Sequence, residues 1–206
     1  MQFANYNAFR VACQKLIEGD DTTGTFNLNT LDLMIGLGEA RVYRDLRATT
    51  MQKALAATVT GNAATLPADL VELNEVYFDG GQPLQVVPLD RLRVLEAIGM
   101  SNGAQTVVCA QDGDTLRFWP AASGTVLGSY YARPDPLETI TWADATTFAR
   151  YPELFLYATL VEAMPLLGME ANVQLWEAKY QQALSNALHD ERMRVYGGSP
   201  LRIRTR

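Results

Sequence analysis

Hydrophobic positions recur at helical spacing near the start of the chain. Apolar side chains lie three or four positions apart in two segments, residues 3–18 and residues from about Asn29 to Thr50. This spacing predicts two amphipathic helices. The glycine- and aspartate-rich run 19–24 between them predicts a turn. Asn27 or Asn29 is a suitable N-cap for the second helix.

The middle of the chain changes to a period of two. After Gly61-Asn62, the stretches TLPADLVELNEVYF and QPLQVVPL predict two strands joined by a turn at Asp79-Gly80-Gly81. Leu89 to Ile98 predicts a short helix that Gly99 ends. TVVCA and TLRFW predict a second hairpin around QDGD, and TVLGSYYAR predicts a further strand. The pattern therefore predicts a small antiparallel β unit.

Helical spacing returns from about Thr141. Tyr151-Pro152-Glu153 is typical of a helix start, and Gly168 of a helix end. A last helix over about 170–195 carries an apolar stripe that includes Trp176, Tyr180 and Leu184. Such a helix is nearly 40 Å long, at about 1.5 Å per residue. A domain of this size cannot cover all of it, so we expect part of it to pack on another chain.

The predicted fold class is α+β and mainly α. The helices of the two ends form a helical bundle, with a small antiparallel β insertion and an extended C-terminal tail. The expected segments are N-terminal core helices at 1–68, the β insertion with its short helix at 69–134, C-terminal core helices at 135–195 and an extended basic tail at 196–206.

Composition excludes several classes of protein. The chain has 206 residues, of which 48% are hydrophobic, enough for one domain or a domain with a large insertion. No segment approaches the roughly 20 consecutive apolar residues of a membrane span, and the N-terminus lacks the pattern of a secretory signal. We therefore expect no membrane partner. Cys13 and Cys109 are expected to be free, buried thiols of a reducing compartment.

The end of the chain differs in charge from the rest. The net charge is −6, and the last 15 residues contain five arginines and no acid, which leaves −11 on residues 1–191. Gly197-Gly198 and Pro200 favour an extended, flexible path, and beyond them apolar residues alternate with arginines. We expect this tail to be disordered alone and to order on a partner as an added strand or extended peptide. The alternating residues are Leu201, Arg202, Ile203, Arg204, Thr205 and Arg206.

Nothing in the sequence indicates a catalytic, cofactor-binding or metal-binding site. His189 is the single histidine and lies among charged neighbours, which is typical of an exposed side chain. QDGDT lies between two predicted strands and is interpreted as a hairpin turn, and GLGEA has neither a third glycine nor a preceding strand. Two pairs of acids, Glu72 with Glu75 and Asp190 with Glu191, are of the kind that any acidic protein offers by chance.

Three arginines of the second helix, Arg41, Arg44 and Arg47, recur at i, i+3 and i+6. This spacing places them on one face. They are either a solvated face with local ion pairs or a contact with acids of another subunit.

Several stretches, in order from about Phe9 to Leu201, resemble the head-to-tail adaptor (connector) proteins of tailed bacteriophages. IGLGEARVYRDLRATTM is similar to the second helix of that family, and TLPADLVELNEVYFDGGQPLQVVPLDRL to its entry into a β hairpin and short helix. LRFWPAASGTVLGSYYARPDPL is similar to its aromatic-Pro strand and the strand with paired tyrosines. RYPELFLYATLVEAMPLLGMEANVQLWEAKYQQAL resembles its C-terminal helix pair.

The resemblance implies a structural role in the virion, with assembly in the host cytoplasm. Such adaptors form rings, usually of twelve copies, beneath the portal ring, extend the DNA channel without reading its sequence, and present a surface to the tail or nozzle protein below. It also implies that the C-terminal segment reaches the portal. The portal-binding residues expected on this basis are Tyr196, Leu201, Arg202, Ile203, Arg204 and Arg206. From the three arginines on one helical face of an acidic protein, we expect Arg41, Arg44 and Arg47 to face acids of the neighbouring subunit in such a ring.

Two other functions remain open from the sequence. A nucleic-acid-binding module would use the arginine tail and would bind more weakly as salt rises. A cell-wall hydrolase would use paired carboxylates across a cleft.

Overall fold

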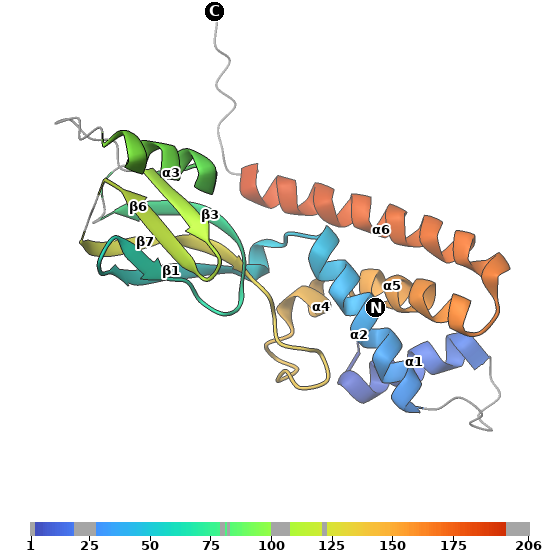
Figure 1. Cartoon of the computed structure of the whole chain (residues 1–206). Helices are drawn as coiled ribbons and strands as arrows, with labels where there is room; N and C mark the ends of the chain where they lie inside the picture. Colours follow the sequence, from blue (N-terminus) through green and yellow to red (C-terminus); the bar gives the residue numbers. More distant parts are fainter. Residues whose placement is uncertain are drawn as a thin grey trace, which may run out of the picture. The chain divides into compact units, whose positions relative to one another are not determined.

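The chain folds into two compact units. The computed structural model describes residues 3–18, 28–78, 81, 83–99, 108–120 and 123–196 (Figure 1). Unit 1 combines Met1–Thr50 with Pro134–Arg206, and unit 2 is the continuous segment Met51–Arg133. The fold is mixed α/β, with helices from both ends of the chain in unit 1 and two sheets in unit 2.

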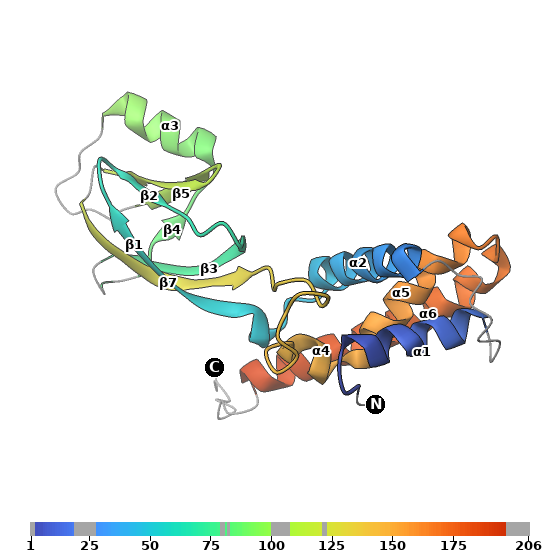
Figure 2. The ribbon, with the colours of Figure 1, turned by 90° about the horizontal axis from the view of Figure 1, so that it is seen from below.

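Unit 1 is helical and is organised around one central helix. Helix α5 contacts each of the other four helices of the unit, which Figures 1 and 2 show around it. Ten of its 15 residues are buried, as expected for a helix that is apolar on every side. The helices of unit 1 are α1 (Tyr6–Glu18), α2 (Leu28–Asp45), α4 (Thr146–Arg150), α5 (Pro152–Leu166) and α6 (Glu170–Tyr196).

The predicted start and end of α5 are confirmed. Pro152 occupies the first turn, where its missing N–H costs nothing. Beyond the end of the helix, Gly168 adopts a left-handed conformation with φ of 69°, which a glycine tolerates better than other residues.

Helix α2 approaches α5 closely at Gly38. A Cβ atom added there would lie 2.7 Å from the backbone nitrogen of Thr159 and 2.9 Å from its Cα. Only glycine permits this distance between the two helix backbones. The second glycine of GLGEA thus serves helix packing.

Aromatic side chains join α1 to the C-terminal helices. The Phe9 and Phe148 rings lie 4.9 Å apart in an edge-to-face arrangement, and Phe148 lies 5.2 Å from Phe155. Such pairs add about 0.5–1.5 kcal/mol to the burial of their area. The indole N–H of Trp142 donates to the carbonyl of Phe3 at 3.0 Å. Residues from opposite ends of the chain therefore share one core.

Unit 2 contains two sheets whose facing sides share a core (Figure 2). One sheet has the order β1-β7-β3 and is antiparallel; the other has the order β2-β6-β5-β4, and its β4–β5 pair is parallel. The strands are β1 (Gln52–Val59), β2 (Ala63–Thr65), β3 (Leu70–Phe78), β4 (Gln85–Val86), β5 (Val108–Asp112), β6 (Thr115–Trp119) and β7 (Gly124–Ala132).

Helix α3 (Leu89–Ile98) forms a third layer on the outer face of the second sheet. Its fully buried Leu92 packs with Val87 and Ala110. Gly99 ends the helix in a left-handed conformation, so this prediction is confirmed at both ends. The β5–β6 hairpin around Gly113, which has φ of 59°, is also confirmed.

The strands before and after Asp79-Gly80-Gly81, predicted to pair as a hairpin, lie in different sheets of the structure. Strand β3 pairs along its length with β7, and β4 pairs with β5. The isolated bridge between Tyr77 and Pro83 is what joins the two segments locally. Asp79 and Gly80 lie outside the described residues. Strand β7 carries Gly128 opposite β3, where a Cβ would collide with the Glu75 carbonyl oxygen, so this close pairing requires a glycine.

Strand β1 was not predicted. The expectation of N-terminal helices throughout 1–68 does not hold here, because β1 and β2 lie in that range and unit 2 begins at Met51. Ala54, Ala56 and Ala57 favour helix and interrupt the alternation of apolar and polar residues. Pairing with β7, some 70 residues away in sequence, decides the conformation.

Candidate functional site

The predicted portal-binding residues lie at and beyond the end of α6. Tyr196 is the last residue of that helix, and its side chain is not among those described. Leu201, Arg202, Ile203, Arg204 and Arg206 lie outside the described residues. Portal binding by the tail therefore stays a prediction. The last turns of α6, from which the tail continues, lie among the described residues.

A buried glutamate fixes that part of α6. The Glu191 side chain accepts hydrogen bonds from the Thr49 backbone N–H at 2.7 Å, from the Tyr151 hydroxyl at 2.7 Å and from Arg150 at 3.0 Å. Burial alone would raise the pKa of Glu191, but these donors outweigh it and hold the pKa below its ordinary value. Burial and the hydrogen bond to Glu191 raise the pKa of Tyr151 to about 12. The Glu191 network thus joins α6 to the segment after α2, through Thr49, and to the junction of α4 and α5, through Arg150 and Tyr151.

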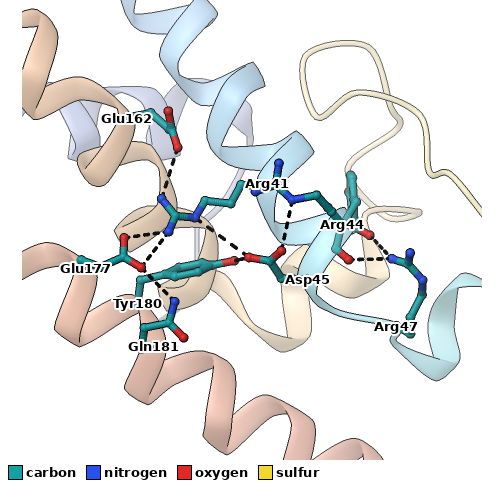
Figure 3. A network of polar contacts seen from close by, with 9 residues as sticks. Arg41, Arg44, Asp45, Arg47, Glu162, Glu177, Tyr180 and Gln181 are labelled. Atoms are coloured by element: carbon teal, nitrogen blue, oxygen red, sulfur yellow. Dashed lines mark hydrogen bonds and ion pairs between the residues drawn. The ribbon is translucent and has the colours of Figure 1, made fainter.

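A second polar network joins α2 to α5 and α6 around Arg41 (Figure 3). The Arg41 Nη2 atom lies 2.7 Å from both carboxylate oxygens of Glu177, and Nη1 lies 3.3 Å from Glu162. Its guanidinium carbon lies 4.6 Å from the centre of the Tyr180 ring. The hydroxyl of Tyr180 donates to Asp45 at 2.8 Å. Arg41 of α2 therefore contacts acids of its own chain on α5 and α6.

The electrostatics of this network follow from burial and charge. Burial by itself would lower the pKa of Arg41, but the hydrogen bond and charge of Glu177 outweigh it and raise the pKa. Burial raises the pKa of Tyr180, and the hydrogen bond to Asp45 raises it further. Arg41 is therefore charged and Tyr180 neutral at neutral pH. The network is therefore a fixed structural contact.

The other two arginines of the predicted face are placed differently. Arg44 has a side chain that is 72% exposed, compared with 18% for Arg41, and its Nε lies 3.2 Å from Asp45 (Figure 3). Arg47 lies beyond the end of α2, and its guanidinium donates to the carbonyl oxygens of Tyr43 and Arg44 (Figure 3). An arginine at this place satisfies the last carbonyls of a helix. The role of all three at a subunit contact stays a prediction, and Arg44 is the most exposed of them.

The predicted stripe of α6 is only partly buried. Tyr180 is fully buried, and Ala183, Ala187 and Glu191 continue the buried face. Trp176 is half-buried and stacks on Tyr157 of α5 with 6.0 Å between the ring centres. The ammonium of Lys179 lies 4.9 Å from the centre of the Trp176 ring.

An open groove of about 310 Å³ lies beside this stack, between α5 and α6. Its floor and walls combine small, aromatic and polar side chains, with one acid at one end and one lysine at the other. The lining residues are Glu153, Tyr157, Lys179, Gln182, Ala183 and Asn186. A shallow groove of this composition suits a protein contact better than a small molecule, which needs an enclosed apolar pocket.

The residues considered above for catalysis are exposed or make structural hydrogen bonds. His189 is exposed, and Asp190 is exposed beside the buried Glu191. Glu72 and Glu75 lie on an edge strand, and Glu75 accepts a hydrogen bond from Tyr77. Among the described residues, no group of three or more His, Cys, Asp and Glu side chains could hold a metal ion. Within the same ranges, no helix is long and apolar enough to cross a membrane.

Both cysteines are free and buried, as expected. Burial raises the pKa of Cys13 to about 12 and that of Cys109 to about 11. Such thiols remain protonated at neutral pH and are poor nucleophiles.

Sequence reasoning missed the two polar networks. Glu191 could have been found, because it lies eleven positions after Tyr180 and so shares the buried face of α6. A carboxylate on a buried stripe must have partners. The contact of Arg41 with Glu162 and Glu177 left no such signal, since it depends on how three helices pack.

The family model described as SU10 adaptor protein matches residues 4–204, nearly the whole chain. No curated protein matches the chain.

Proposed function

The chain belongs to the SU10 adaptor protein family, a family of phage head-to-tail adaptors, and from this membership we propose a structural role at the junction between head and tail. The protein forms a ring, with twelve copies as the expected number, beneath the portal ring. The ring extends the DNA channel and offers an attachment surface to the tail or nozzle protein below. The match over residues 4–204 is the observation that carries this proposal.

The charge of the chain supports this role. Residues 1–191 carry a net charge of −11, and a negatively charged channel wall does not adhere to passing DNA. Buried networks around Arg41 and Glu191 join helices within unit 1. A protein that must bear load between head and tail benefits from such fixed contacts, since charge-assisted hydrogen bonds are the stronger ones.

The partner of the basic tail is the portal. Residues 197–206 continue from the segment of α6 that Glu191 anchors. Leu201 and Ile203 provide an apolar edge and Arg202, Arg204 and Arg206 a basic one, which suits an extended peptide added to a sheet or groove with acidic walls.

Deleting residues 197–206 tests this assignment. The truncated protein should keep the melting temperature of the full chain and should fail to attach to portal-containing heads, measured by co-sedimentation. A second variant with Arg202, Arg204 and Arg206 changed to glutamine separates the basic edge from the apolar one. Attachment of the truncated protein with unchanged affinity would show that the tail is not the portal-binding segment.

The five arginines after Glu191 also favour a second candidate, a nucleic-acid-binding module. It predicts that the full chain binds duplex DNA with an affinity that falls steeply with salt, and that the truncated chain does not. If the tail is needed for DNA binding and the full chain does not attach to heads, the tail is a nucleic-acid-binding segment and not a portal-binding one.

A further inference from the structure

One exposed face of α2 carries no charge for three turns. Leu33 is 60% exposed and Leu37 45% exposed, although both are large apolar side chains. Gly36 and Ala40 lie between and beside them, also exposed, and Arg44 follows as the first charged residue of this face. These five residues, called the α2 ridge below, recur at three- and four-residue spacing and therefore form one continuous line on the helix.

Contacts among the described residues do not explain Gly36. A Cβ atom at this position would meet nothing within 4 Å. A glycine inside a helix is less favourable than alanine, so α2 carries a cost there that packing within the described part of the chain does not require. Gly38, two positions later, is required by the approach to Thr159. The small residue at position 36 is explained if a partner helix or groove approaches the ridge.

The groove between α5 and α6 lies on a different side of unit 1. Glu177 faces Arg41 of α2, and Asn186 of the groove follows nine positions later on α6, which is half a turn around the helix axis. This side of α6 is low in charge: from Asn172 to His189 the charged residues are Glu177 and Lys179. A surface depleted of charge is typical of the core of an interface.

The ridge and the groove match in spacing and in charge. On the ridge, Arg44 lies seven positions after Leu37 and eleven after Leu33. On α6, Asn186 lies seven positions after Lys179 and eleven after Leu175, which is 54% exposed. The shorter spacing is about 10 Å and the longer about 16 Å, and each is the same on α2 as on α6.

The chemistry also agrees at each end of this alignment. Glu153 lines the groove together with Asn186, so the arginine end of the ridge would meet an acid. At the other end, Leu37 would lie opposite the stem of Lys179, beside the stacked rings of Tyr157 and Trp176, and Leu33 opposite Leu175. The reverse orientation would place Arg44 at the Leu175 end, one helical turn from Lys179, and so bring like charges close together.

We propose that the α2 ridge of one copy packs into the α5–α6 groove of the next copy, with Arg44 paired to Glu153. This inference rests on the proposed ring and names the contact that builds it. One surface meets a different one, so the contact is head-to-tail and can be repeated around a closed ring. Gly36 and Ala40 let the helix of the ridge approach α6 closely.

A disulfide test examines the register directly. Ala40 lies four positions before Arg44, and Gln182 lies four positions before Asn186, and both side chains are exposed. The full-length double variant Ala40→Cys/Gln182→Cys should give a ladder of dimers, trimers and higher species on a non-reducing gel. Each single variant and the matched pair Ala40→Cys/Gln181→Cys, which places the second thiol on another side of α6, should give none.

Charge reversal tests the ion pair. Arg44→Glu and Glu153→Arg should each raise the concentration for half-assembly by about tenfold or more, and the double reversal should bring it back close to the original value. Arg93→Glu, on the exposed side of α3, is the control and should change nothing. Particle mass is measured by native mass spectrometry, with and without portal protein. Circular dichroism checks the fold of each variant.

The outcomes separate this contact from the ring itself. Rings that form without the Ala40–Gln182 ladder, or a double reversal no better than the single ones, would overturn the contact and leave the ring standing. A chain that stays monomeric at every concentration, with and without portal protein, would overturn the proposed ring and the contact together.

Discussion

Gly38→Ala tests how closely α2 packs on α5, with Gly36→Ala as a matched control on the same helix. Both changes add one methyl group and remove the same backbone freedom from the unfolded chain. At position 36 the new Cβ meets nothing within 4 Å, whereas at position 38 it would lie 2.7 Å from the Thr159 nitrogen. The two variants therefore differ in one term, the contact of the methyl group with α5.

The magnitudes have opposite signs. Gly36→Ala should stabilise unit 1 by about 0.5–1 kcal/mol, the difference in helix propensity. Gly38→Ala gains the same amount but must move α2 away from a backbone that cannot rotate aside, and overpacking of this kind costs about 1–3 kcal/mol. A net loss of about 1–2 kcal/mol is expected, or roughly 2–8 °C in melting temperature for a chain of this size.

Urea unfolding followed by tryptophan fluorescence measures both variants. Trp142 and Trp176 report on unit 1, and Trp119 reports on unit 2. The midpoint of unit 1 should rise for Gly36→Ala and fall for Gly38→Ala. If Gly38→Ala is as stable as the original protein, or changes in the same direction as Gly36→Ala, the close approach of the two helices is refuted.

Two further predictions concern α6. Glu191→Gln should lower stability at neutral pH by about 2–3 kcal/mol, because charged hydrogen bonds to Thr49, Tyr151 and Arg150 are weakened. The pKa of Glu191 is lower in the folded protein than its ordinary value of 4.5, so its contribution is present above that pH and is lost as the pH falls through the folded value. The gap between the two proteins in urea unfolding should therefore narrow below about pH 4.5, and a gap that is constant from pH 7 to pH 3 would contradict the role of the charge. Trp176→Ala should lower the free energy of unfolding by about 1–2 kcal/mol, less than the 3–5 kcal/mol typical of a core tryptophan, because the ring is half-buried and loses mainly its stack on Tyr157. Thermal unfolding measures this, and a loss as large as that of a core residue would show that the ring is buried in solution.

The sequence by itself determined the elements whose signals are local. Pro152 and Gly168 set the start and end of α5, Gly99 ended α3, and Gly113 marked the β5–β6 hairpin. Each of these residues restricts or permits the backbone at its own position, so its effect does not depend on the rest of the fold. The resemblance of ordered motifs also identified the family, which the match over residues 4–204 confirmed.

Tertiary structure decided what depends on residues far apart in the chain. Residues 52–59 form a strand because β7 pairs with them, although their alanines favour helix. Arg41 was placed on a shared face with Arg44, yet it points to Glu162 and Glu177 because three helices meet there, while Arg44 stays exposed. Spacing along a helix states which side chains share a face but not which face another helix covers. That choice, which separates a structural arginine from one open to a partner, follows only from the packing of the whole unit.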